Sequence, residues 1–70
     1  MNMMKNIIII PTYNEAENIE RMIRKVFSLP RGFHILVVDD NSPDGTAGIV
    51  KRLQAVFSEQ LFMLERAGKQ

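Results

Sequence analysis

The sequence contains no cysteine, so it can form neither a disulfide bond nor a metal site built on thiolates. A surplus of one charge is missing too, because nine basic residues balance eight acidic ones and leave a net charge of +1. No basic surface for nucleic acid is therefore predicted, and nucleic acid is not expected as a partner. The first ten residues hold only a four-residue isoleucine run, shorter than a secretory leader or a membrane span requires, and we expect a buried strand there.

The composition is that of an ordinary globular protein: 46% of the 70 residues are hydrophobic and 24% are charged. This length allows one small domain or a piece of a larger one, and a domain of this size is only marginally stable on its own. Residues 66–70 follow a strand-like run without a capping helix or a closing strand. We therefore expect the chain to be truncated at its C-terminus, a frayed natural tail being the alternative.

Hydrophobic periodicity predicts an alternation of strands and helices. The isoleucine run at 7–10, ended by Pro11, is typical of a central parallel strand buried on both faces. We expect a helix to follow, with Asn14 as its N-cap and the acidic Glu15 and Glu17 in its first turn. Its apolar face has helical spacing, at Ile19, Met22, Ile23, Val26 and Phe27.

The second half of the chain repeats this alternation. Residues 34–38 predict a second strand, and residues 61–65 predict a third. Between them we expect a helix from about residue 44 or 46 to residue 57, capped by Ser42 or Asp44. The order strand–helix–strand–helix–strand predicts right-handed crossovers, a parallel sheet and an α/β fold, with no linker that would divide two domains.

Polar residues cluster where the first two strands end, at 11–15 and 39–44. In open parallel sheets, ligands bind beyond the carboxyl ends of the strands. If the two strands are neighbours, both clusters face one edge of the sheet. We therefore interpret them as two walls of one ligand site.

Four residues in these clusters, with Val38 directly before the second cluster, are suited to the base and ribose of a nucleotide. An ionised Asp40 only accepts hydrogen bonds, as a uracil or guanine N–H would require. Glu15 is placed to accept a ribose hydroxyl or to serve the helix start, and Tyr13 offers a flat ring. Pro11 provides a rigid apolar wall, and Val38 provides backbone groups.

The sequence offers few residues that could bind a phosphate. The glycine-rich phosphate-binding patterns are absent after the first strand and elsewhere, and Asp39, Asp40 and Asp44 would repel a phosphate unless a metal intervened. Arg66 and Lys69, just past the third strand, are the candidates for a phosphate contact. No metal ligand and no catalytic residue is predicted within the chain.

Structural roles compete with these functional ones. Asn14 and Asp44 are also common helix caps, and paired aspartates occur in ordinary turns. However, two adjacent carboxylates are costly, because like charges held close together raise each other's pKa. We therefore predict a ligand-binding role for Asp40, with Asp39 pointing inward to accept backbone hydrogen bonds. His34 is expected to be structural or on the surface.

Two segments, Ile-Ile-Pro-Thr-Tyr-Asn-Glu at 9–15 and Val-Val-Asp-Asp-Asn-Ser-Pro-Asp-Gly-Thr at 37–46, resemble the start of the family 2 inverting glycosyltransferases. The Asn-Ser-Pro-Asp-Gly-Thr extension is most similar to the polyprenol-phosphate (dolichyl-phosphate) mannosyltransferases. The resemblance covers nearly the whole chain. It implies a Rossmann-like, nucleotide-diphospho-sugar-binding fold of the GT-A type, with the nucleotide contacted by Pro11, Tyr13, Glu15, Val38 and Asp40.

The same resemblance implies transfer of mannose from GDP-mannose to a polyprenyl phosphate, with Mg²⁺ or Mn²⁺ as cofactor. The metal-binding Asp-x-Asp and the later basic residues of the family are absent from the sequence. We therefore expect residues 1–70 to be the N-terminal part of a single glycosyltransferase domain, inactive in isolation. The lipid acceptor implies a cytoplasmic protein, peripheral at the cytoplasmic face of the membrane.

Three alternatives remain open. The first is that the chain belongs to another family 2 glycosyltransferase, which uses a UDP-sugar. The second is a binding module without catalytic activity, which binds nucleotide weakly or not at all. Residues 35–41 also resemble the first strand of a response-regulator receiver, in which paired acids bind Mg²⁺ beside a phospho-accepting aspartate. A receiver needs that aspartate on a later strand, and the sequence has no aspartate beyond Asp44.

Overall fold

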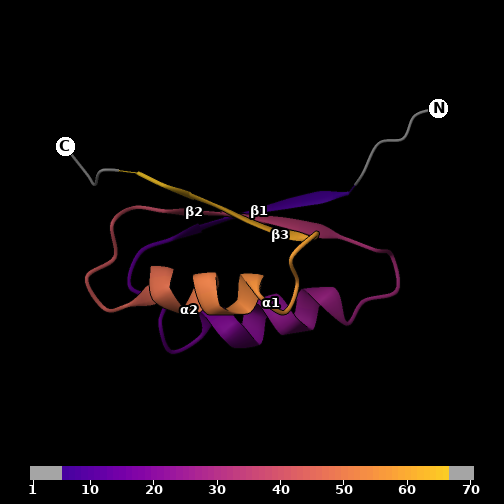
Figure 1. Cartoon of the computed structure of the whole chain (residues 1–70), viewed down its shortest axis with the longest axis horizontal. Coiled ribbons are helices and arrows are strands. Elements are labelled where there is room, and N and C mark those ends of the chain that lie inside the picture. Colours follow the sequence, from indigo (N-terminus) through magenta and orange to yellow (C-terminus); the bar gives the residue numbers. More distant parts are fainter. Residues whose placement is uncertain (1–5, 67–70) are drawn as a thin grey trace.

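The computed structural model describes residues 6–66 and forms two layers, a parallel sheet and a pair of helices (Figure 1). In chain order the elements are β1 (Ile7–Thr12), α1 (Ile19–Phe27), β2 (His34–Asp39), α2 (Thr46–Gln54) and β3 (Leu61–Glu65). All strand pairs are parallel, and the strand order in the sheet is β1-β2-β3. The predicted α/β class, the alternation of elements and the bounds of β3 are confirmed.

Both helices pack on the same face of the sheet (Figure 1). Alternate residues of each strand point to this face, and at the centre of the sheet Ile35 and Val37 are fully buried. The buried core consists of Ile19, Ile23, Ile35, Val37, Val50, Leu53 and Leu61. Phe27 and Phe57 close one end of the core, with ring centroids 4.6 Å apart.

Within residues 6–66, the first strand is not central and buried on both faces, as was predicted. In this part of the chain β1 is an edge strand that pairs with β2 alone, and Ile7 and Ile9 are 60% and 61% exposed. A β-branched run is compatible with any strand that packs on apolar neighbours, so it does not specify the place of that strand in the sheet. The edge position also explains why Pro11 lies within β1, because proline is tolerated in edge strands.

The sheet face away from the helices is apolar. Every second residue of each strand points to this face. The apolar ones are Ile7, Ile9, Pro11, Leu36, Val38, Phe62 and Leu64. Among the described residues no helix covers this face (Figure 1). His34 lies at its start, partly buried, with its ring stacked on that of Phe62 at 6.4 Å between centroids.

Each helix differs from its predicted range at one end, whereas α2 begins at Thr46 as predicted. α1 begins at Ile19 rather than near Asn14, because Asn14 has a left-handed backbone with φ of 59° and is not a helix cap. Asparagine adopts this conformation more easily than other residues with a β-carbon. α2 ends at Gln54, three residues before the predicted end at residue 57. Hydrogen-bonded turns follow it, including the bond from Phe57 N to Leu53 O.

Candidate functional site

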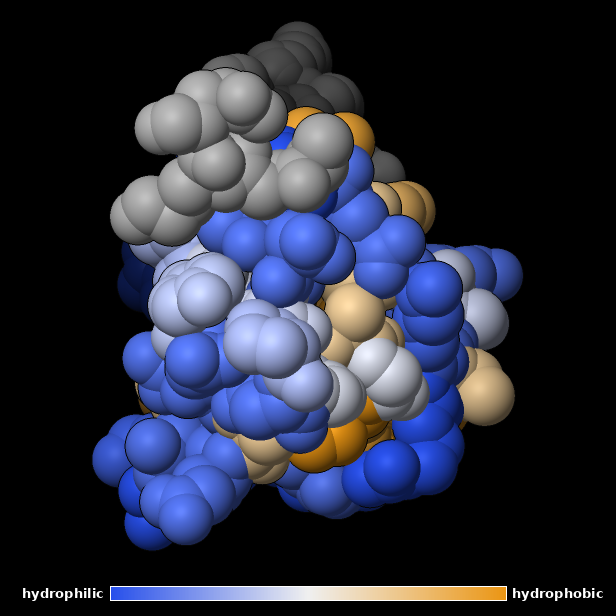
Figure 2. All heavy atoms as spheres, turned by 90° about the vertical axis from the view of Figure 1, so that its left-hand side faces the viewer, coloured by the Kyte–Doolittle hydropathy of each residue, from blue (hydrophilic) through white to orange (hydrophobic). Residues whose placement is uncertain are grey.

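The candidate site lies at the carboxyl edge of the sheet, where two loops meet. We call residues 13–18, after β1, the first loop, and residues 40–45, after β2, the second loop. Both lie on the left of Figure 1, where all three strands end. Figure 2 looks onto this edge and shows a mainly hydrophilic surface. The predicted convergence of two polar clusters on one edge is confirmed.

Three successive amides of the first loop are bound by side chains from the second loop and the start of α2. The donors and acceptors are Asn14 N and Ser42 Oγ at 2.9 Å, Glu15 N and Thr46 Oγ1 at 3.0 Å, and Ala16 N and Asp44 Oδ2 at 3.0 Å. The left-handed turn at Asn14 stands at the head of this run of amides. The first loop is therefore held by contacts across 28 to 31 residues of sequence rather than by a helix of its own.

Asp39 anchors the second loop from inside. Its side chain is 1% exposed and accepts hydrogen bonds from Thr12 Oγ1 at 2.7 Å, from Ser42 Oγ at 2.6 Å and from Ser42 N at 2.9 Å. The prediction that Asp39 points inward to accept backbone hydrogen bonds is confirmed for Ser42 N. Two hydroxyl donors, which the sequence did not indicate, join it.

The charge of Asp39 is stabilised by these donors. Burial raises the pKa of its carboxyl, but the hydroxyl and amide of Ser42 and the hydroxyl of Thr12 outweigh burial and hold the pKa below its ordinary value. The ionised carboxylate therefore stabilises the fold at neutral pH. This contribution is lost as the pH falls from the pKa of an unfolded aspartate to the lowered folded value.

The N-cap of α2 is Gly45 and not Ser42 or Asp44 as predicted, but the Asp44 carboxylate contacts both the first residue of the helix and the first loop. Its Oδ1 accepts from Thr46 N at 3.1 Å and from Thr46 Oγ1 at 2.5 Å, while its Oδ2 accepts from Ala16 N. The Thr46 hydroxyl holds the pKa of Asp44 below its usual value. Gly45 lies between them with φ of 90°, a conformation open to glycine because it has no β-carbon.

Asp40 points away from Asp39, because consecutive residues of an extended chain face opposite sides of the sheet. Its carboxylate is bound at both oxygens by Arg66, with Nε to Oδ1 at 2.6 Å and Nη2 to Oδ2 at 3.0 Å. The expected repulsion between Asp39 and Asp40 is therefore relieved by geometry. Arg66, a candidate for a phosphate contact, is the partner of Asp40, and its contact with a phosphate stays a prediction. Lys69 lies outside the described residues.

The five residues predicted to contact a nucleotide all lie at this edge. Pro11 and Val38 are register partners on the uncovered face of the sheet, and Asp40 follows Val38 on the same face. Tyr13 is half exposed in the first loop, and Glu15 is partly buried beside it. Their contact with a nucleotide stays a prediction.

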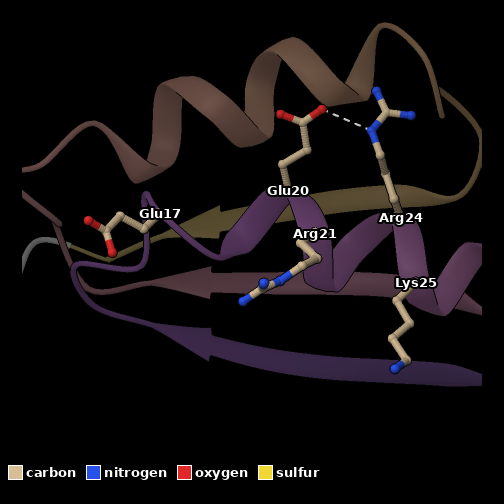
Figure 3. A pocket seen from close by; sticks show the side chains of 5 residues that line it. All are labelled: Glu17, Glu20, Arg21, Arg24 and Lys25. Carbon is tan, nitrogen blue, oxygen red and sulfur yellow. Dashed lines mark hydrogen bonds and ion pairs between the residues drawn. The ribbon is translucent and has the colours of Figure 1, made fainter.

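A hollow of about 380 Å³ opens at the ends of β2 and β3. It is lined by Asp39, Asn41, Ser42, Ala47, Glu65 and Arg66. A larger hollow of about 640 Å³ lies on the outer surface of α1 (Figure 3), lined by Glu17, Glu20, Arg21, Arg24 and Lys25. There Glu20 is paired with Arg24 at 2.9 Å and with Arg52 at 3.4 Å, so this surface is a solvated network of ion pairs along α1, with Glu17 of the first loop at one end.

The described residues do not fit a metal centre. Residues 6–66 contain no group of three or more His, Cys, Asp or Glu side chains arranged to hold an ion. Asp39 is committed to hydroxyl and amide donors and Asp40 to Arg66.

Within residues 6–66, neither helix has the length and apolar character needed to cross a bilayer.

A comparison with solved structures supports the GT-A fold. A mannosyltransferase of Pyrobaculum calidifontis, PcManGT, solved in complex with GDP-Man and Mn²⁺, matches with a TM-score of 0.85 and 28% identity. The match covers 94% of this chain and 20% of that one. The predicted nucleotide-diphospho-sugar-binding fold is thereby confirmed, as three parallel strands and two helices of that architecture.

Sequence relatives carry related names. A polyprenol monophosphomannose synthase of Mycolicibacterium smegmatis is 38% identical over 65 residues, which are 93% of this chain and 24% of the relative. A dolichol-phosphate mannosyltransferase of Pyrococcus furiosus is 49% identical over 45 residues, which are 61% of this chain and 13% of the relative. The chain thus spans about a quarter of the first of these proteins and less of the second. The family model for glycosyl transferase family 2 matches residues 7–70, and the chain belongs to this family.

Proposed function

We propose that this chain forms the base-and-ribose half of the donor site in a mannosyltransferase that acts on GDP-mannose and a polyprenyl phosphate. The observation that carries the proposal is the convergence of the first loop and Asp40 at the carboxyl edge of a family 2 sheet. The names of the relatives and the GDP-Man in the similar solved structure support the choice of donor and acceptor.

In the proposed reaction, the bond between the mannose anomeric carbon and the diphosphate of GDP breaks, and GDP leaves. A new bond forms from that carbon to a phosphate oxygen of the polyprenyl phosphate. The residues of this chain bind and orient the guanosine end of the donor. The groups that bind the diphosphate and the acceptor belong to other parts of the enzyme, as does the divalent ion, Mg²⁺ or Mn²⁺.

Guanine suits Asp40 because it presents two adjacent N–H donors on one edge, at N1 and N2. An ionised carboxylate accepts hydrogen bonds from such donors, and Arg66 binds both oxygens of Asp40. Asp40 is therefore held in a fixed orientation at the uncovered face of the sheet. Pro11 and Val38 form an apolar wall below it, and Tyr13 supplies a ring beside the ribose end.

The remaining parts of the proposal concern the whole protein. Residues 1–70 are the N-terminal part of a single glycosyltransferase domain, and this part alone does not catalyse transfer. Because the acceptor is a lipid phosphate, the enzyme works in the cytoplasm, peripherally at the cytoplasmic membrane face. Because the chain belongs to glycosyl transferase family 2, the alternative of a response-regulator receiver domain is set aside.

A segment exchange tests the function. Residues 7–66 of this chain would replace the matching segment of the Mycolicibacterium smegmatis relative, and the chimera would be assayed for polyprenyl monophosphomannose with GDP-mannose and Mn²⁺. We expect product formation, and we expect Asp40→Ala in the chimera to abolish most of it. A chimera that is folded by circular dichroism but forms no product would contradict the proposal.

A further inference from the structure

We propose that Ser42, Asp44 and Thr46 are positioning residues, which set the nucleotide affinity by fixing the first loop without touching the nucleotide. This inference rests on the proposed function, since the first loop carries Tyr13 and Glu15. It assigns a role to the Asn-Ser-Pro-Asp-Gly-Thr segment that the proposed function leaves unexplained.

Two of the three contacts are relays in which a carboxylate orients a hydroxyl. Ser42 Oγ donates to Asp39 Oδ1 at 2.6 Å, so its lone pairs are left to accept the amide of Asn14. Thr46 Oγ1 donates to Asp44 Oδ1 at 2.5 Å and accepts the amide of Glu15 in the same way. A hydroxyl that donates to an anion becomes a better acceptor, so each carboxylate strengthens the contact beyond it.

The third contact is direct, from Ala16 N to Asp44 Oδ2. Asp44 therefore serves two neighbouring amides, one through Thr46 and one by itself. Thr46 is fully buried and begins α2, whereas Asp44 is exposed. The amides of the first loop are thus tied to the rigid end of a helix, and this helix is packed into the core through Val50 and Leu53.

The first loop depends on these contacts. It lies between the end of β1 and the start of α1, and its left-handed residue Asn14 interrupts any regular hydrogen-bond ladder. If a loop is ordered in only a fraction of the molecules, its apparent affinity for a ligand is the affinity of the ordered loop multiplied by that fraction. Loss of one of these bonds lowers the ordered fraction and so weakens binding, although no atom that contacts the nucleotide has changed.

Thr46→Val tests this role, because valine keeps the volume and removes the hydroxyl. Since one such hydrogen bond shifts an equilibrium by roughly five- to tenfold, we expect the Kd for GDP, measured by calorimetry on the 70-residue chain, to rise by about that factor. We expect hydrogen exchange at the amide of Glu15 to accelerate by a similar factor. Thr46→Ser, which restores the hydroxyl, is expected to return both values to within about twofold of the original.

Gln54→Ala is the matched control, since it removes a side-chain hydrogen bond at the other end of the same helix, from Gln54 Nε2 to the Leu61 carbonyl oxygen at 3.1 Å, and leaves both loops intact. Under conditions in which both variants are folded, it should leave the Kd for GDP unchanged. An equal rise in Kd for Gln54→Ala and Thr46→Val, or unchanged exchange at Glu15 in Thr46→Val, would overturn the positioning role. Absence of GDP binding by the unaltered chain would instead contradict the proposed function, and the exchange measurement would still decide the positioning role.

Discussion

Replacement of Asp39 by alanine is expected to lower the free energy of unfolding by about 3 kcal/mol, because it strands several buried donors at once. The carboxylate accepts from Thr12 Oγ1, Ser42 Oγ and Ser42 N, and its residue is 1% exposed. In the alanine variant these three donors lose their buried acceptor, and a small cavity opens beneath the second loop. Urea denaturation followed by circular dichroism measures the loss.

Asp39→Asn is the companion variant. Its amide keeps the volume and one oxygen, which still accepts from a hydroxyl, but its NH₂ group faces the Ser42 N–H and cannot accept from it. We therefore expect a loss between that of Asp39→Ala and zero. A change of less than about 1 kcal/mol for Asp39→Ala would show that this network does not hold the two loops together.

Asp40→Asn is expected to weaken GDP binding by about tenfold or more, since hydrogen bonds to a charged group contribute about 1.5–3 kcal/mol. The asparagine NH₂ group would oppose a guanine N–H donor, and the ion pair with Arg66 that orients the side chain would be lost. Calorimetric titration of both forms of the chain with GDP gives the ratio of the two Kd values.

Glu59→Gln provides the matched change of charge. Glu59 is exposed in the turn before β3, at the opposite edge of the sheet from the candidate site. Its replacement should leave the Kd for GDP unaltered. Equal affinity of the Asp40→Asn and unaltered chains would contradict the assignment of Asp40 to the base, and an equal loss in Glu59→Gln would show that net charge alone is responsible.

The order of elements was predictable because local periodicity determines it. Residues 61–65 were expected as a strand and are one, and the apolar spacing from Ile19 to Phe27 identified the buried face of α1. The place of β1 at the edge of the sheet formed by residues 6–66 was not predictable, because no local pattern states which strands become neighbours. Asn14 was misjudged because asparagine suits both a helix cap and a left-handed turn, and tertiary contacts decide between them.

The features of the site that depend on where the strands end were predictable. Those that depend on contacts between residues distant in the sequence were not. The meeting of the two loops and the inward direction of Asp39 followed from parallel topology and from the cost of adjacent carboxylates. The pair of Asp40 with Arg66 joins residues 26 positions apart, and the contact of Glu15 with Thr46 joins residues 31 apart. A serine or threonine hydroxyl that serves a distant amide has no signature of its own in the sequence.

We propose that the carboxyl edge of this sheet recognises guanosine. Titration of the 70-residue chain with GDP and with UDP in metal-free buffer tests this recognition. We expect saturable binding of GDP, with UDP weaker because uracil offers Asp40 a single N–H. Absence of saturable GDP binding by the folded chain, or UDP binding as tight as that of GDP, would contradict it.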